Sequence, residues 1–229
     1  MGDREAAIVK VIDSLASVDA AAWDACANSP GEIHNPFVSH AFLRALEESG
    51  SATRRTGWLG QHLLLEDGEG RLAGCMPLYL KNHSRGEYVF DHGWANALEN
   101  AGGRYYPKLQ CSVPFTPATG PRLLTPEGPG RDAAEDMLLA GAVELAKRHN
   151  VSSLHITFMP ERQWGRAGEL GLLQRTDQQF HWFNRGYRSF GDFLADLSSR
   201  KRKMIRKERE KALESGIEIE CLTGSDLSE

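Results

Sequence analysis

The sequence predicts a mixed α/β fold (α+β) in which a mostly antiparallel sheet is flanked by helices. Short strand-like runs separated by turn residues fill 56–90, and the clearest amphipathic helix of the chain follows at 131–149. A strand is expected directly after that helix, over 151–158, as in a strand, helix, strand unit. The hydrophobic fraction of 41% is typical of a chain that builds a packed core.

The first 50 residues are expected to be helical. Within 6–27, apolar side chains recur at i, i+3, i+4 and i+7, at Ile8, Val11, Ile12 and Leu15. Ser39 is a preferred N-cap residue, and Gly50 is typical of a residue that follows a helix end. We therefore predict a second helix between Ser39 and Gly50.

The next segment changes to the period of a strand. Runs at 62–66, 71–80 and 87–90 predict an antiparallel meander, and Asp67–Gly70 has the composition of a hairpin turn. Residues 91–120 are rich in aromatic residues, proline and glycine. Such a region either covers a core or lines a pocket.

The second half of the predicted domain alternates between strands and helices. A strand is expected at 121–124, and the helix over 131–149 has acidic residues at its start and basic residues at its end, which suits the helix dipole. The strand at 151–158 is followed by a predicted helix over 161–170 and a predicted strand over 172–183.

The last 40 residues are expected to begin a second domain. Ser189–Ser215 predicts one long helix, and Ile217–Leu222 predicts a strand. We place the boundary near Gly186, so that 1–186 form a first domain and 187–229 form a linking basic helix with the first strand of a second. An edge strand without partners favours the interpretation that the second domain is cut short.

Composition and motifs exclude several classes of function. The net charge is −4, and the four cysteines contain no C-x-x-C pair. No apolar run approaches the roughly 20 residues that span a bilayer, and no signal-peptide pattern opens the chain, which predicts a cytoplasmic protein without a membrane span. The signatures of phosphate-binding loops, zinc proteases and serine hydrolases are absent from the sequence.

Two glycine patterns invite a nucleotide or coenzyme interpretation. The pattern Arg162-x-x-Gly165-x-Ala167 fits the consensus that holds the pyrophosphate of coenzyme A, but it falls inside a predicted short helix. The position that such a loop should occupy, Thr125–Arg131, contains Pro129, which has no N–H donor, and the carboxylate of Glu127. We interpret 125–131 as a plain turn at the start of a helix.

Several phrases of the chain resemble the FemAB-like family of bacterial proteins. They are Asn35–His40, Tyr105–Leu109, Val113–Gly120, Gln179–Trp182 and Ser199–Arg209. The resemblance runs across nearly the whole chain and implies a fold like that of the GNAT acetyltransferases, with a second GNAT-like domain that would pack on the first.

The resemblance also implies a reaction, namely transfer of an acyl or aminoacyl group to an amine. The implied acceptor is a small molecule or a peptidoglycan precursor, and the implied donor is acyl-CoA or aminoacyl-tRNA, with no covalently bound cofactor and no metal. No catalytic residue is assigned, and this chain alone is expected to be inactive without the rest of the second domain.

Candidate acceptor-binding residues lie in the aromatic region. Rings supply stacking walls, and hydroxyl and ammonium groups supply oriented donors, in Tyr105, Tyr106, Lys108, Phe115, Thr116 and Thr119. The same rings are equally consistent with a cover over the sheet. His155 and His181 lie in strand-like runs, where a lone histidine is more often structural than catalytic.

Candidate anion-binding residues lie on the basic helix, at Arg200, Lys203, Arg206 and Lys207. Arg200, Lys203, Lys207 and Lys211 fall along one stripe of a helix, which can face tRNA, coenzyme A or a nucleotide-linked precursor. A solvated helix face is the alternative. Three functions stay open at this point: a transferase, a non-catalytic module that binds a cell-wall precursor, and an RNA-binding protein.

Overall fold

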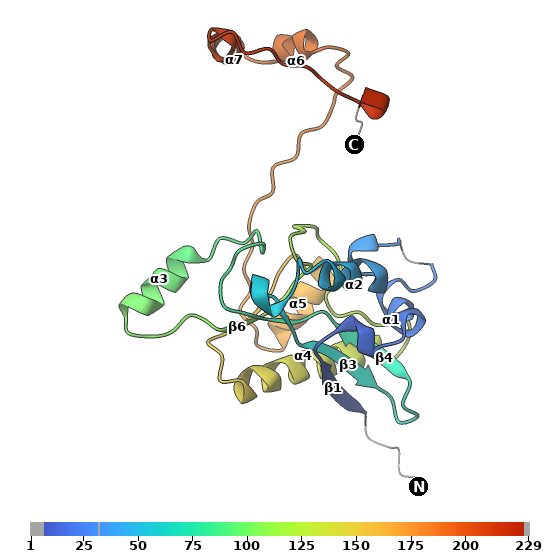
Figure 1. Cartoon of the computed structure of the whole chain (residues 1–229). Coiled ribbons are helices and arrows are strands. Elements are labelled where there is room, and N and C mark those ends of the chain that lie inside the picture. Colours follow the sequence, from blue (N-terminus) through green and yellow to red (C-terminus); the bar gives the residue numbers. More distant parts are fainter. Residues whose placement is uncertain (1–6, 32, 227–229) are drawn as a thin grey trace. The chain divides into compact units, whose positions relative to one another are not determined.

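The computed structural model describes residues 7–31 and 33–226, and the chain divides into two compact units, 1–175 and 176–229 (Figure 1). The predicted boundary near Gly186 falls within the second unit, and the assignment of 187–229 to a second GNAT-like domain stays a prediction. Each unit is described by itself below.

The first unit contains all the strands that the described residues form. They are β1 Ile8–Ile12, β2 Leu59–Gly60, β3 His62–Glu66, β4 Leu72–Met76, β5 Tyr79–Lys81, β6 Lys108–Cys111 and β7 Leu154–Ile156. Its α-helices are α1 Ala20–Ala27, α2 His40–Glu48, α3 His92–Asn100, α4 Arg131–Arg148 and α5 Glu161–Glu169. Short 3-10 helices lie at Leu15–Ser17, Pro36–Val38 and Arg54–Thr56.

The strands form two sheets. One has the order β1-β3-β4, and the other has the order β2-β5-β6-β7. All pairs are antiparallel except β6 and β7, which are parallel and are connected through α4. The predicted mixed α/β fold, with mostly antiparallel strands flanked by helices, is confirmed.

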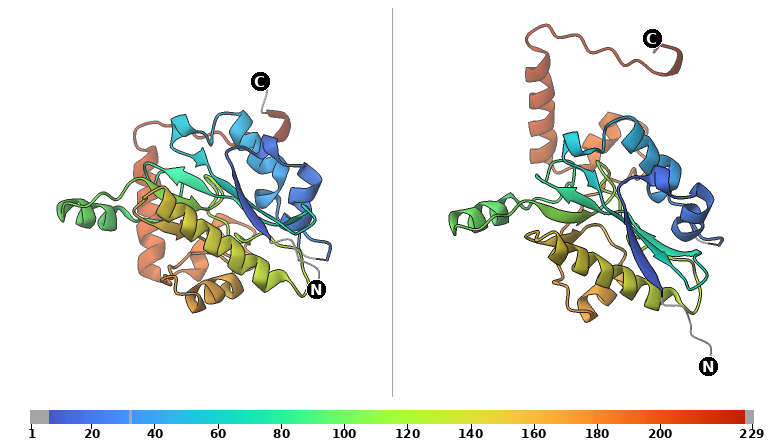
Figure 2. Two further views of the ribbon diagram at one scale, coloured as in Figure 1. Left: turned by 90° about the horizontal axis from the view of Figure 1, so that it is seen from below. Right: turned by 60° about the horizontal axis from the view of Figure 1, so that its bottom comes forward.

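Helix α4 covers the apolar side of both sheets (Figure 2). Its buried residues Leu138, Leu139 and Ala142 belong to one core cluster with Leu63 of β3 and Leu109 of β6. The helix backbone approaches β1 closely at Gly141, where a Cβ atom would lie 2.9 Å from a methyl group of Val9. Glycine therefore fixes the distance between α4 and the sheet.

Several predicted elements are confirmed with small changes of boundary. Ser39 caps α2 by accepting from the N–H of Phe42, and α4 begins at Arg131 as predicted. The hairpin turn at Asp67–Gly70 joins β3 to β4, with Gly70 at φ +75°, a conformation that favours glycine. The predicted strand over 121–124 is reduced to a single bridge between Leu124 and Cys75.

Other predicted elements are wrong. Ile8–Ile12 is a strand rather than a helix, because its β-branched residues pair along β3. Residues 87–90, 172–183 and 217–222 form no strand, since no neighbouring strand offers them hydrogen bonds. Within 91–120, helix α3 and strand β6 were not predicted.

The second unit holds two helices in place of the predicted single one. They are α6 Phe190–Asp196 and α7 Ser199–Leu213, separated at Leu197, which is extended, and Ser198, which caps α7. Ser189 and Asp192 form a reciprocal capping box at the start of α6. No helix among the described residues of either unit is long and apolar enough to cross a lipid bilayer.

Candidate functional site

Strands β5, β6 and β7 have one apolar face and one polar face. In their register Lys81 lies opposite Lys108, Tyr79 lies opposite Gln110, and Gln110 lies beside His155. Neighbouring residues alternate between the faces of a strand, so Leu80, Leu109 and Leu154 point the other way, toward the core. We call Tyr79, Lys81, Lys108, Gln110 and His155 the polar face.

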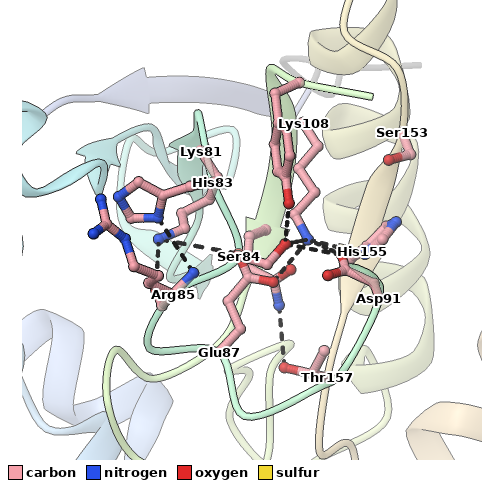
Figure 3. Close-up of polar contacts among 12 residues, drawn as sticks. Lys81, His83, Ser84, Arg85, Glu87, Asp91, Lys108, Ser153, His155 and Thr157 are labelled. Carbon is pink, nitrogen blue, oxygen red and sulfur yellow. Dashed lines mark hydrogen bonds and ion pairs between the residues drawn. The ribbon is translucent and has the colours of Figure 1, made fainter. Parts of the chain in front are cut away.

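The connection between β5 and α3 covers this polar face. It brings Ser84, Glu87 and Asp91 over Lys108, as Figure 3 shows. The Lys108 Nζ atom lies 2.5 Å from Asp91 Oδ2, 2.7 Å from Glu87 Oε2 and 2.9 Å from Ser84 Oγ. Lys108 is fully buried, and Glu87 and Asp91 are 2% exposed, so this network is closed to solvent.

Burial and hydrogen bonding act in opposite directions on the two carboxyl groups. For Asp91, burial alone would raise the pKa, but hydrogen bonds from Lys108, Ser84 and Tyr105 lower it below its ordinary value. For Glu87, burial raises the pKa above its ordinary value in spite of the nearby lysine ammonium groups. Asp91 is therefore the firmer anion, and Glu87 is the carboxyl group closer to protonation.

Lys81 lies in a different environment from its cross-strand neighbour. Its Nζ lies 3.3 Å from the centre of the Trp58 ring, 3.3 Å from the Arg85 carbonyl oxygen and 4.0 Å from Glu87 Oε1. Burial lowers the pKa of Lys81 to about 7, and the positive charge of Lys108 acts in the same direction. Near neutral pH this amine can therefore accept a proton, which an ordinary lysine cannot.

His155 stands at the edge of the same network. Its Nδ1 lies 3.5 Å from Lys108 Nζ and 3.9 Å from Asp91 Oδ2. Burial lowers the pKa of His155 to about 4, with Lys108 contributing in the same direction. The imidazole is thus neutral at neutral pH.

Two of the predicted acceptor-binding tyrosines contact this network through their hydroxyl groups. Tyr105 donates to Asp91 Oδ2 at 2.8 Å, and the Tyr106 hydroxyl lies 2.8 Å from Ser84 Oγ. Burial and the Asp91 carboxylate raise the pKa of Tyr105, so it stays a hydrogen-bond donor. The structure therefore brings Tyr105, Tyr106 and Lys108 together, as the resemblance and the residue types suggested, although their role in binding stays a prediction.

The remaining candidate residues lie elsewhere. Phe115 packs its ring 5.5 Å from that of Trp58, Thr116 donates to the Pro114 carbonyl oxygen, and Thr119 is exposed. The predicted anion-binding side chains are exposed on α7 of the second unit, at Arg200, Lys203, Arg206 and Lys207.

The segment with the coenzyme A consensus lies within α5, as predicted. Arg162 pairs with Asp132 at 3.0 Å and with the buried Glu135, both on α4. Its guanidinium is thus used to join two helices. In 125–131, Gly130 precedes α4 without a side-chain cap, and Arg131 pairs with Glu127.

Unpaired buried polar atoms concentrate around the polar face. Nine buried side-chain nitrogen or oxygen atoms of the described residues have no hydrogen-bond partner. Six of them belong to the polar face, its cover or the adjoining side chains, in Trp58, Tyr79, Glu87, Asp91, Gln110 and Ser112. Since buried polar groups are nearly always paired in folded proteins, such a concentration indicates a site kept for function.

The sequence analysis missed Lys81, Glu87 and Asp91. A signal was present, because polar residues alternate with apolar ones at Tyr79-x-Lys81 and Lys108-x-Gln110 within otherwise buried strands. Among 7–31 and 33–226, no group of three or more histidine, cysteine, aspartate or glutamate residues is arranged to hold a metal ion.

Comparison with known proteins gives one family and one weak structural likeness. An acetyltransferase of Trypanosoma brucei is similar over 78% of this chain and 100% of its own, with 12% identity and a TM-score of 0.43, a level that does not assign a fold. No curated protein matches the sequence. The family model of FemAB-like proteins, described by peptidoglycan biosynthesis or recognition, matches residues 14–229. The chain therefore belongs to the FemAB-like family.

Proposed function

We propose that the chain contributes to an N-acyltransferase of GNAT-like architecture, which joins an acyl or aminoacyl group to an amine of a peptidoglycan precursor. The family supports a role in peptidoglycan biosynthesis or recognition. The observation that carries the proposal is the polar face, where Lys81 and Lys108 lie directly opposite each other but in different charge environments.

Two opposed lysines would repel each other if both were cations of equal freedom. The structure avoids this by giving Lys108 two carboxylate partners and leaving Lys81 with only a carbonyl oxygen at 3.3 Å and a carboxyl oxygen at 4.0 Å. Lys81 is consequently the member of the pair that loses its proton. A neutral amine in a buried site is suited to act as a general base.

In the proposed reaction the acceptor amine attacks the carbonyl carbon of the donor. A carbon–nitrogen bond forms, the bond between the acyl carbon and its sulfur or oxygen leaving group breaks, and Lys81 takes the proton that the amine loses. That proton then neutralises the leaving group. Lys108 acts as a positioning residue that holds Asp91 and Glu87 around this amine.

The donor is proposed to be acyl-CoA or aminoacyl-tRNA, both of which are polyanions. The exposed cations Arg200, Lys203, Arg206 and Lys207 on α7 are suited to the phosphate groups of either donor. Residues 125–131 offer little for this purpose, because Arg131 is already paired with Glu127.

The test is a mass-spectrometric assay of acyl transfer to a muropeptide amine, with acetyl-CoA and aminoacyl-tRNA supplied in separate reactions, from pH 5.5 to 9. Because the pKa of Lys81 lies at about 7, kcat/KM should rise through that pH in the unaltered protein. Lys81→Met should lower kcat/KM by about 100-fold or more and remove the inflection.

Lys147→Met, which alters an exposed lysine near the end of α4, is the matched control and should leave the profile unchanged. An unchanged profile in Lys81→Met would contradict the assignment of the base. A complete lack of transfer with both donors would contradict the proposed activity.

A second candidate function is recognition of a cell-wall precursor without catalysis. It is favoured by the closed state of the network, in which Lys81, Lys108, Glu87 and Asp91 are at most 2% exposed. Saturable, weakly salt-dependent binding of a muropeptide without turnover would support it. Binding of tRNA alone, with steep salt dependence that Lys203→Gln and Lys207→Gln reduce, would instead support an RNA-binding role.

A further inference from the structure

An open pocket of about 230 Å³ lies beside the polar face but outside the network already described. Its walls come from the end of β1, the end of α2 and the segment that leads into β2, and they include Asp13, Glu47, Arg54, Trp58 and Tyr79. At about 30 Å³ per water molecule, the volume suits a ligand the size of roughly eight waters.

The charged residues of this pocket favour a cation. Glu47 is held as an anion: burial would raise its pKa, but hydrogen bonds from His62, Ser14 and the Leu15 N–H lower it below its ordinary value. Asp13 is exposed and its carboxylate has no partner among the described residues. Two carboxylates therefore stand against one guanidinium, that of Arg54.

His62 is already committed and does not compete for the ligand. Its Nδ1 accepts the Leu78 N–H at 3.2 Å, so Nε2 carries the proton and donates to Glu47 Oε1 at 3.2 Å. The imidazole is fully buried behind Glu47. The pair thus fixes the orientation of the carboxylate that lines the pocket.

The aromatic residues of the pocket carry unused hydrogen-bond donors. Trp58 and Tyr79 are at most 1% exposed, and neither the indole Nε1 nor the phenol oxygen has a partner. Burial and the Glu47 carboxylate raise the pKa of Tyr79, so its hydroxyl remains protonated. With Glu47 this close, a neutral carbonyl is a better acceptor for these donors than a second carboxylate.

The same two rings connect the pocket with Lys81. The Lys81 Nζ lies 3.3 Å from the centre of the Trp58 ring, and Tyr79 is two residues from Lys81 on the same face of β5. The rings of Trp58 and Tyr79 pack edge to face with centroids 5.2 Å apart. A ligand in the pocket therefore lies one aromatic layer away from the proposed base.

We propose that this pocket binds a small molecule or peptide end that carries a primary ammonium group next to a neutral carbonyl. The ammonium is held by Asp13 and Glu47, and the carbonyl oxygen accepts from Tyr79 and Trp58 after a small rotation of either ring. The role of this ligand as the amine acceptor rests on the proposed function, whereas its binding does not.

Isothermal titration calorimetry of the full chain with L-alaninamide, without any acyl donor, tests the site. L-alaninamide should bind more tightly than N-acetyl-L-alaninamide, which lacks the ammonium group, and more tightly than L-alanine, which brings a carboxylate beside Glu47. Asp13→Asn should weaken binding about fivefold, as expected for a partly exposed ion pair. Tyr79→Phe should weaken it up to about tenfold through loss of one donor.

Glu161→Gln and Tyr88→Phe, which alter exposed residues away from the pocket, are the matched controls and should leave the affinity unchanged. Equal loss in the controls, tighter binding of L-alanine, or no binding of any of the three compounds would overturn the proposal. Acyl transfer without alaninamide binding would overturn the pocket alone. Alaninamide binding without transfer in the assay above would overturn the transferase and keep the pocket.

Discussion

On one face of β5, β6 and β7, Leu80, Leu109 and Leu154 join the core under α4, while on the other face, one residue along each strand, lie Lys81, Lys108 and His155. The first face gains free energy by removing apolar surface from water. The second face is buried as well, but it holds charges that lose their hydration and polar atoms that find no partner. One sheet thus shows side by side what stability alone selects and what it does not.

The largest effect should follow from removing the cation at the centre of the polar face. Lys108→Met should lower the free energy of unfolding by about 4 kcal/mol, because Glu87 and Asp91 stay buried without the ammonium group that pairs with them. Urea unfolding at neutral pH, followed by circular dichroism, measures the change. Lys147→Met, at an exposed position of α4, should change it by less than about 0.5 kcal/mol.

If Lys108→Met were as stable as the unaltered protein, the network would not need its cation, and the contrast between the faces would be lost. A combined Lys108→Met and Asp91→Asn variant sharpens the comparison. Removing one unpaired charge should restore part of the lost stability, since the penalty comes from the carboxylates left behind.

A somewhat smaller loss is expected on the apolar face. Leu109→Ala should lower the free energy of unfolding by about 3 kcal/mol, since Leu109 is fully buried in the cluster under α4 and its removal leaves a cavity. The same urea titration measures it. Leu170→Ala, at a residue that is 44% exposed, is the control. A loss on Leu109→Ala no larger than that of the control would show that α4 does not depend on this face.

The comparison also shows which parts of the fold were predictable from the sequence. Helix α4 and the β3–β4 hairpin were predicted because caps, dipole charges and turn residues are local signals. β1 was predicted as a helix because four apolar residues happen to fit helical spacing, whereas the pairing of Ile8–Ile12 with β3 is a long-range interaction. The predicted strand over 172–183 failed for the converse reason, since the sheet offers it no partner.

The site divides in the same way. Tyr105, Tyr106 and Lys108 are near one another in sequence and were proposed together from their residue types. Lys81, Glu87 and Asp91 join them through the β5–β6 register and the covering connection, neither of which a single sequence displays. The role of Lys81 depends further on Trp58, which comes from outside both strands.

The smallest effect, and the one that depends on pH, should come from Lys81. Its pKa is lowered to about 7 in the folded chain from an ordinary value of 10.5, so the fold disfavours its cation. Between these pH values the unfolded chain binds one more proton, and Lys81 therefore makes stability rise with pH from about 7 to about 10. Lys81→Met should remove this contribution: relative to the unaltered protein it should be stabilised at pH 6, by on the order of 1 kcal/mol, with the advantage shrinking toward pH 10. Urea titrations of both proteins across this range measure the difference. A constant difference between pH 6 and 10 would mean that Lys81 keeps an ordinary pKa, and that the two lysines of the polar face are equivalent after all.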